Sequence, residues 1–196
     1  MREGRAGWDL GNAVLYDLCR QHPGHLDTDA VLAKVWLIGR AYAAPIERCA
    51  RSTGAPRNEQ FYTERAVPAI VASPLDAWLE RLTGVALTWE SVPDILSVHH
   101  DLTVLFTRIS GCAQRSLASK YLHFHRPDLF FLYDSRATEA ARKKCVTPRP
   151  VEMRGLEADS EYSLFVRRCM CVRDALRAAG GDLHDPRAID RLFLGY

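Results

Sequence analysis

Two side chains near the middle of the chain, Lys120 and Asp134, could do chemistry together. Lys120 lies in an amphipathic stretch in which Leu117, Tyr121 and Phe124 recur at steps of three and four residues, the period of one helix face. An amine beside such a face either extends its methylene stem to the surface, or it stays in a low-dielectric pocket where the charged form is disfavoured and a nucleophile becomes available. The sequence leaves both alternatives open.

Asp134 follows the short apolar run Leu129 to Tyr133 and precedes a predicted helix over Ala137 to Lys144. A carboxylate at that position accepts backbone N–H groups and is stabilised by the helix dipole. It either caps the helix alone, or it also faces a pocket and stabilises a developing positive charge. Both roles are compatible with the spacing.

From roughly 105 to 140 the chain resembles the helix-hairpin-helix DNA glycosylases, including 8-oxoguanine glycosylase-like proteins. Those enzymes carry Leu-Pro-Gly-Val/Ile-Gly in the hairpin, a lysine shortly after it in the lyase members, and an aspartate 19 residues beyond that lysine. Aligned without a gap, Ile109 to Ala113 falls on the hairpin, Arg115 on the lysine and Asp134 on the aspartate. The resemblance implies a degenerate helix-hairpin-helix at about 101–125.

The chain departs from that pattern in two ways. Only Gly111 of the hairpin glycines is present, and Arg115 cannot form a Schiff base because its guanidinium stays protonated. Lys120 is turned by about 140° from Arg115 on a helix of 3.6 residues per turn, so we do not expect it to substitute. Lyase activity is therefore not expected, whereas a hydrolytic mechanism that needs only Asp134 stays open.

The block Ser-x-x-Ser-Lys-Tyr-Leu-His-Phe, followed by Pro and Tyr-Asp-Ser, is also similar to bacterial proteins of this superfamily, some of which occur in antiphage operons. The resemblance implies a protein that recognises a modified purine nucleobase or nucleoside in nucleic acid and hydrolyses its N-glycosidic bond. The alternative is a non-catalytic helical binding module that keeps the glycosylase scaffold in a defence or regulatory assembly with protein partners. Loss of the hairpin glycines favours this second hypothesis.

A flipped base needs aromatic faces for stacking and a few polar groups that recognise its edge. Asp134 and Lys120 are the predicted catalytic residues. The predicted nucleic-acid or base contacts are Gly111, Arg115, Ser116, Trp36, Arg40, Tyr42, His123, Tyr133 and Arg136. Core packing would explain Trp36 and Tyr42 equally well, and Arg40 could pair with Glu47 on a helix face. The basic segment Arg136 to Lys144 would follow a phosphate backbone, or it is a solvated helix end.

No metal and no cofactor is predicted. Adjacent His99 and His100 point to different helix faces, and no Cys-x-x-Cys pair is present among the six cysteines. We interpret those cysteines as small buried hydrophobes in a reducing, cytoplasmic compartment, because no apolar signal segment stands near Met1. The segment His22 to His25 is predicted to be a solvated turn.

The bulk composition is that of an ordinary globular protein. The 196 residues are 47% hydrophobic and 26% charged with a formal net charge of +2, which favours one folded domain over 1–196 and gives no strong field for nucleic acid. No apolar run approaches the ~20 residues of a membrane span, so no membrane partner is expected.

The hydrophobic periodicity predicts a compact multi-helix, all-α domain similar to the helix-hairpin-helix glycosylase fold, with little or no sheet. The strand-like runs Val85 to Thr88 and Leu129 to Tyr133 are too short and isolated to build one. A polar loop is expected over Arg51 to Glu59, and Ser73 is expected to cap a helix that begins at Pro74. Helices are predicted over residues 9–20, 30–50 with a break at Pro45, 61–71, 74–82, 94–109, 115–124, 137–144, 160–179 and 186–194.

Overall fold

The computed structural model describes residues 3–49, 59–181 and 185–195. Every regular element in these ranges is helical, which confirms the all-α prediction, and residues 85–88 and 129–133 form no strand. The elements are α1 (Glu3–Gln21), α2 (Thr28–Ala41), the 3₁₀ turn η1 (Ile46–Arg48), the π-helical turn η3 (Phe61–Ala66), α3 (Val67–Val71), α4 (Leu75–Glu80), α5 (Val92–Ser110), α6 (Arg115–His125), α7 (Ser135–Lys144), α8 (Ser160–Ala178) and α9 (Pro186–Leu194).

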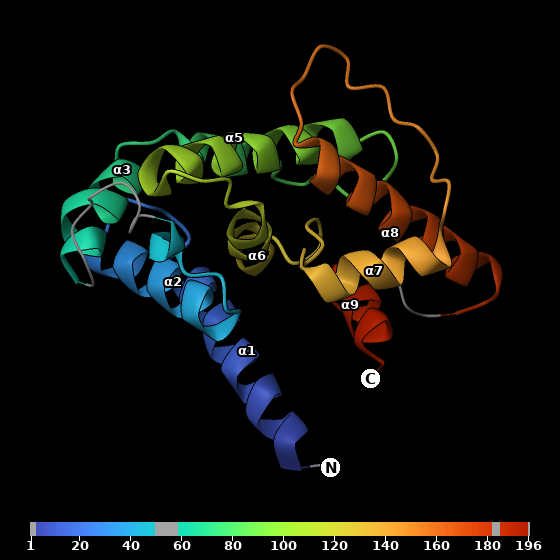
Figure 1. Ribbon diagram of the computed structural model, residues 1–196, viewed down its shortest axis with the longest axis horizontal. Helices are drawn as coiled ribbons and strands as arrows, with labels where there is room; N and C mark the ends of the chain where they lie inside the picture. The colour runs from blue at the N-terminus through green and yellow to red at the C-terminus, as the bar shows by residue number, and fades with distance from the viewer. Residues whose placement is uncertain (1–2, 50–58, 182–184, 196) are drawn as a thin grey trace.

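Two apolar clusters lie on either side of α6, which Figure 1 shows nearly end-on at the centre of the molecule. The first cluster is built by α1 to α4 with most of α5 and α6, and the second by α7, α8 and α9. Helix α5 crosses the top of the view and serves both, because Leu102 and Phe106 pack in the first cluster while Val92 and Leu96 pack in the second. The two halves therefore share one long helix.

The apolar run after α6 carries the chain from the first cluster to the second. Leu129 and Phe130 are buried in the first, and Phe131 is buried in the second. Because this segment is neither helix nor strand, its carbonyls need side-chain partners. The Tyr162 hydroxyl donates to the Phe131 carbonyl over 3.0 Å, and His123 Nδ1 donates to the Phe130 carbonyl over 2.7 Å. The crossing delivers Asp134 to the start of α7 beside α6.

The break predicted at Pro45 is confirmed, since α2 ends at Ala41, Ala43 takes a positive φ of 51°, and Pro45 is the N-cap of the separate 3₁₀ turn η1. Two other predictions are wrong. Helix α1 begins at Glu3 rather than at Asp9. Ser73 does not cap α4, because its hydroxyl donates backwards to the Ile70 carbonyl over 2.6 Å. The loop predicted over residues 51–59 lies outside the described residues, apart from Glu59.

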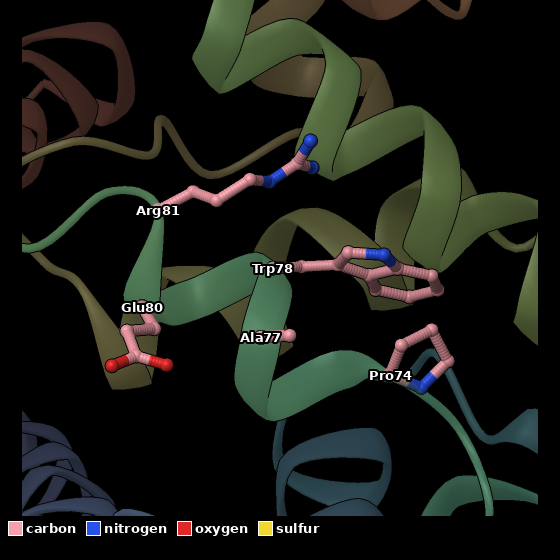
Figure 2. Close-up of a pocket in the computed structure, with 5 residues that line it drawn as sticks. All are labelled: Pro74, Ala77, Trp78, Glu80 and Arg81. Atoms are coloured by element: carbon pink, nitrogen blue, oxygen red, sulfur yellow. The ribbon is translucent and has the colours of Figure 1, made fainter.

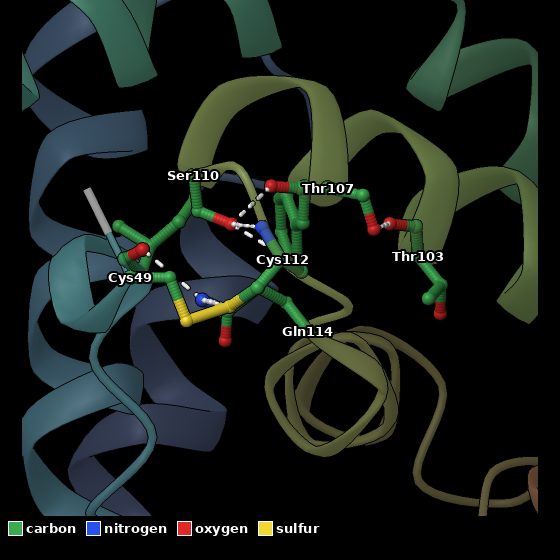
Figure 3. Close-up of a disulfide and its surroundings, with 8 residues drawn as sticks. Cys49, Thr103, Thr107, Ser110, Cys112 and Gln114 are labelled. Atoms are coloured by element: carbon green, nitrogen blue, oxygen red, sulfur yellow. Dashed lines mark hydrogen bonds between the residues drawn. A yellow bond between two sulfur atoms is a disulfide. The ribbon is translucent and has the colours of Figure 1, made fainter. Parts of the chain in front are cut away.

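The hairpin between α5 and α6 is held by a glycine, a serine and a disulfide (Figure 3). Gly111 ends α5 in the left-handed region at φ 86°, where a side chain would be strained. The Ser110 hydroxyl bonds within the turn, and Cys112 is joined to Cys49, 63 residues earlier in the chain. The prediction of six thiols is therefore wrong for these two cysteines, whose scattered positions gave no pairing signal. Cys19 and Cys169 are buried thiols, as predicted.

Across the described ranges, no helix combines the length and the hydropathy that a membrane crossing would need.

Candidate functional site

Lys120 lies on α6 where the two apolar clusters meet, and its side chain turns inward. The residue is only 2% exposed. Its amine donates to the Ser116 hydroxyl over 2.6 Å and to the Tyr133 carbonyl over 2.8 Å, and it lies 5.8 Å from the centre of the Tyr42 ring. Of the two alternatives that the sequence left open, the structure adopts the buried amine.

Burial lowers the pKa of Lys120 to about 8. The carboxylates of Asp134 and Asp190 oppose that shift, and the Arg48 guanidinium adds to it. A lysine with a pKa of about 8 has roughly a tenth of its amine unprotonated at pH 7, against less than about 0.1% for an ordinary lysine. The amine is thus held by two hydrogen bonds inside the protein, and burial lowers its pKa.

Asp134 takes one of the two roles that the sequence left open, that of the helix cap, and its charge also acts on the pKa of Lys120. One carboxylate oxygen accepts the Ala137 N–H over 2.8 Å, which confirms Asp134 as the N-cap of α7. The same carboxylate acts electrostatically on Lys120, because the carbonyl of the preceding residue, Tyr133, is bonded to the lysine amine. Capping fixes the negative charge at the side of the amine.

A second carboxylate, that of Asp190 on α9, also acts electrostatically on Lys120. Asp190 is 5% exposed and accepts from Arg187 Nη1 over 2.9 Å. The pKa of Asp190 is raised to about 6, chiefly by burial. Asp134 contributes to the rise, and Arg187 and Lys120 oppose it. Arg187 and Asp190 were not predicted as site residues, because an Arg and an Asp three apart on a short amphipathic helix are typical of an ordinary surface ion pair.

Tyr42 joins the lysine to this ion pair. Its hydroxyl donates to Asn12 Oδ1 over 2.7 Å, and burial raises its pKa to about 12 although hydrogen bonding to Arg187 opposes the shift. Burial raises the pKa of Tyr16 on α1, and the charges of Arg187 and Asp190 also act on it. Of the predicted aromatic contacts, only the Tyr42 ring lies near the Lys120 amine, because Tyr133 contacts it through the backbone carbonyl while its ring packs against Tyr162 and Phe165. Helix α1 contributes residues that the sequence did not single out.

Two of the predicted nucleic-acid or base contacts, Arg115 and His123, bind other protein groups. The Arg115 guanidinium binds both Asp159 carboxylate oxygens, with Nε at 2.9 and 3.1 Å and Nη2 at 2.9 Å, and it also pairs with Glu161 at 3.2 Å. Hydrogen bonding to Asp159 raises the pKa of Arg115. Arg115 thus links α6 to the start of α8. This structural role argues against the prediction that Arg115 contacts nucleic acid.

His123 is fully buried and uses both ring nitrogens. Since Nδ1 donates to the Phe130 carbonyl, Nε2 must accept from the Tyr16 hydroxyl over 2.6 Å. Burial lowers the pKa of His123 to about 4, so the ring is neutral. The structure holds His123 as an internal link between α6 and α1, in place of the predicted contact with a base.

Four other predicted contacts have no contact with the Lys120 amine among its described partners. Trp36 is 45% exposed on α2, and Arg40 pairs with Glu47, which also accepts from Tyr62. Gly111 is exposed on the hairpin, and Arg136 is exposed in the first turn of α7.

A second buried lysine, Lys34 of α2, lies in the first cluster. Its amine donates to the His22 and Gly24 carbonyls, both at 2.9 Å, and contacts His125 Nε2 at 3.4 Å. His25, predicted in a solvated turn, is instead 2% exposed and bonds to Asp76 at 2.5 Å. This network closes the turn onto α2 and α6, because each polar group in it meets a partner.

Surface hollows lie apart from Lys120. One of about 450 Å³ is lined by five residues of the α4 region and is shown in Figure 2, where Trp78 and Arg81 flank it. Another lies between Trp89 and the segment 149–154. Among the residues that the structure describes, no group of three or more His, Cys, Asp or Glu side chains is arranged to hold a metal ion.

Comparison with known proteins gives no match to a family model, to a curated protein or to a solved structure. The resemblance of residues 105–140 to glycosylases therefore rests on the sequence motifs alone.

Proposed function

We propose that the chain is an N-glycosylase-like enzyme that acts on a modified purine base in nucleic acid, with Lys120 as the attacking amine and Asp134 as the electrostatic group. One observation carries the proposal: a nearly buried lysine amine, its pKa lowered to about 8, lies beside a carboxylate fixed at a helix N-terminus. Such an amine is a nucleophile near neutral pH.

The reaction would break the bond between C1′ and the base. The Lys120 lone pair forms a bond to C1′ while the glycosidic electron pair leaves with the base, which takes a proton from solvent. The positive charge that develops on the sugar lies near the Asp134 carboxylate, which stabilises it without reorganisation. The nitrogen then gives up a proton and O4′ takes one up as the C1′–O4′ bond breaks, and the resulting imine between Lys120 and C1′ can be reduced by hydride.

This proposal modifies the expectation of hydrolysis without a lysine. That expectation placed Arg115 at the reactive position, but Arg115 bonds to Asp159 whereas Lys120 bonds to the Tyr133 carbonyl next to Asp134. The lysine and the aspartate are thus brought together by the crossing segment. Water attack assisted by Asp134 alone would need no lysine, and the trapping experiment below separates the two routes.

Helix α7 supports binding of a polyanion. It begins at the Asp134 cap and carries an excess of exposed basic side chains. These are Arg136, Arg142, Lys143 and Lys144. Only Lys143 has an acidic partner within the described ranges, Glu139 at 2.7 Å. A helix of 10 residues extends about 15 Å, so it would contact phosphates over several nucleotides leading away from the lysine.

The test is incubation with oligonucleotides that carry modified purines, with and without borohydride. Wild-type protein should release base and become covalently linked to the oligonucleotide. Lys120→Ala should lose the link, and Arg20→Ala, which removes an exposed cation of α1 outside the proposed phosphate-binding helix, should keep it. Base release by Lys120→Ala would indicate hydrolysis. Absence of both base release and adduct from the wild type, with salt-sensitive oligonucleotide binding retained, would favour the non-catalytic binding module.

A further inference from the structure

A polar stripe runs along α6 at a spacing of three and four residues, on a helix whose other buried residues are apolar or aromatic. Its members are Ser116, Ser119, Lys120 and His123. Ser119 and His123 are completely buried, and Lys120 is nearly so. Polar side chains in an interior are costly unless their polar atoms have partners. His123 meets this requirement at the Phe130 carbonyl, in the segment that crosses from one apolar cluster to the other.

The other three members of the stripe bind the backbone of Tyr133, at the end of the same crossing segment. The Ser119 hydroxyl accepts the Tyr133 N–H over 3.0 Å. The Ser116 hydroxyl and the Lys120 amine both donate to the Tyr133 carbonyl, over 3.0 and 2.8 Å. Side chains of α6 thus supply the hydrogen bonds that the backbone needs where it forms neither helix nor strand.

The direction of each serine hydroxyl is determined by its partners. Because Ser119 accepts a backbone N–H, its own hydrogen is donated to the Ser116 carbonyl, 2.9 Å away. Ser116 accepts from the Lys120 amine over 2.6 Å and donates to the Tyr133 carbonyl. The two serines therefore hold both polar backbone groups of Tyr133. They fix the two peptide planes on either side of its Cα, the second of which contains the Asp134 nitrogen.

We propose that Ser119 is a positioning residue of the Lys120 site, which orients the Tyr133 carbonyl toward the amine and fixes the peptide that leads into the Asp134 cap. Within the described part of the chain, the Ser119 hydroxyl bonds to Tyr133 and Ser116, so it acts on the lysine through these neighbours. The catalytic meaning of this inference rests on the proposed function. Its geometric content concerns the folded protein alone.

The first test is amide hydrogen exchange, read by NMR on the full chain without nucleic acid. In the wild type, the Tyr133 N–H should exchange as slowly as the helical N–H groups of α6, although it lies outside the helix. Ser119→Ala should speed exchange about tenfold at Tyr133 and about threefold at Ala137, whose N–H bonds to the Asp134 carboxylate. Ser119→Thr keeps the hydroxyl and should retain both protections.

Thr103→Ala is the matched control, because it removes another buried hydroxyl, one that donates to the His99 carbonyl over 2.8 Å on α5. The Lys120 ε-carbon resonance should shift in Ser119→Ala and stay in place in Thr103→Ala. A loss of stability without repositioning would leave that resonance in place in both variants.

Two results would overturn the proposal. One is faster exchange at Tyr133 in Ser119→Ala with no change at Ala137 and at the Lys120 resonance, since Ser119 would then act on Tyr133 alone. The other is fast exchange of the Tyr133 N–H in the wild type. This second result can be obtained even if Ser119→Ala does not fold.

The catalytic meaning is tested on oligonucleotides that carry modified purines. Ser119→Ala should lower the rate of covalent trapping about tenfold while the affinity for the oligonucleotide stays within about twofold, because Ser119 is completely buried. An unchanged trapping rate would contradict a positioning role in the reaction. If the wild type itself traps nothing, the proposed function fails, and the exchange and resonance measurements still decide whether Ser119 positions the amine.

Discussion

Two buried lysines, Lys34 and Lys120, have opposite surroundings in this molecule. Lys34 is fully buried, and its amine contacts two carbonyls and the His125 ring nitrogen. Lys120 is 2% exposed and donates to one hydroxyl and one carbonyl, with two carboxylates near it from neighbouring helices. The first amine closes a turn, whereas the second is held among charges that could stabilise a cation.

The difference is one of partners rather than of burial. An ammonium has three donors, and in Lys34 all three have acceptors, so the group satisfies the backbone around it. Within the described ranges, Lys120 has only two acceptors, the Ser116 hydroxyl and the Tyr133 carbonyl. Carboxylates oppose the lowered pKa at both lysines, Asp134 and Asp190 at Lys120 and Asp76 and Asp27 at Lys34. A buried lysine becomes a candidate nucleophile when burial lowers its pKa and its hydrogen bonds leave the ammonium incompletely satisfied.

The largest expected effect is on chemistry. Lys120→Met should reduce covalent trapping on modified oligonucleotides by about a hundredfold or more, since the attacking atom is removed. Lys34→Met, provided that it folds, should trap at a rate within a few-fold of the wild type. Equal losses in both variants, in protein shown to be folded by circular dichroism, would remove the distinction between the two lysines.

Stability should be affected in the reverse order. Lys34→Met removes the fully buried amine that donates to the His22 and Gly24 carbonyls and should lower the free energy of unfolding by about 3 kcal/mol. Lys120→Met loses two bonds but is relieved of a costly buried charge, so a loss of about 1 kcal/mol is expected. Urea unfolding of both variants measures the difference. A larger loss for Lys120→Met would mean that its role is chiefly structural.

Acid should destabilise both regions together. Burial lowers the pKa of His123 to about 4 and of His99 to about 3, and it lowers that of His125 well below 6.5. Between about pH 6.5 and 4 the unfolded chain binds these three protons and the folded chain does not, so stability falls as pH falls. Asp190 opposes this by one proton below about pH 6. The expected slope near pH 5 is about 2 to 3 kcal/mol per pH unit in urea titrations. A flat profile would contradict the buried, neutral histidines.

The smallest expected effect concerns the acceptor of the lysine. Ser116→Ala removes the hydroxyl that receives the Lys120 N–H and donates to the Tyr133 carbonyl over 3.0 Å. A stability loss of about 1 kcal/mol is expected, together with a lower Lys120 pKa, because the charged form loses a partner. Thr107→Ala is a matched control, since it removes a half-buried hydroxyl bonded to a carbonyl elsewhere. Its Lys120 pKa should not change.

Much of the fold was accessible from the sequence because periodicity and caps are local signals. The spacing of Leu117, Tyr121 and Phe124 predicted α6, and Asp134 was predicted as the cap of α7. The sequence did not predict features that depend on a residue far away in the chain. Cys49 forms a disulfide with Cys112 across 63 residues, and His25 is buried where its ring hydrogen-bonds to Asp76 and Tyr121.

The site was predictable only in part for the same reason. Lys120, Ser116, Tyr133 and Asp134 are close in sequence and could be grouped. Asp190 lies 70 residues from Lys120 in the numbering, and nothing in the short α9 segment marks it as different from a surface pair. Arg115 was placed in the site by an alignment frame, but the direction of its side chain depends on Asp159 of the α8 cap.

The most direct test of the central claim is the pKa of Lys120 itself, measured by NMR titration of the ¹³C-labelled lysine ε-carbons and assigned with Lys120→Met. We predict a Lys120 resonance that titrates near pH 8. A Lys120 resonance that titrates at the ordinary lysine pKa of 10.5 would contradict the account, because the amine would then be protonated and unreactive under the conditions in which it is proposed to act.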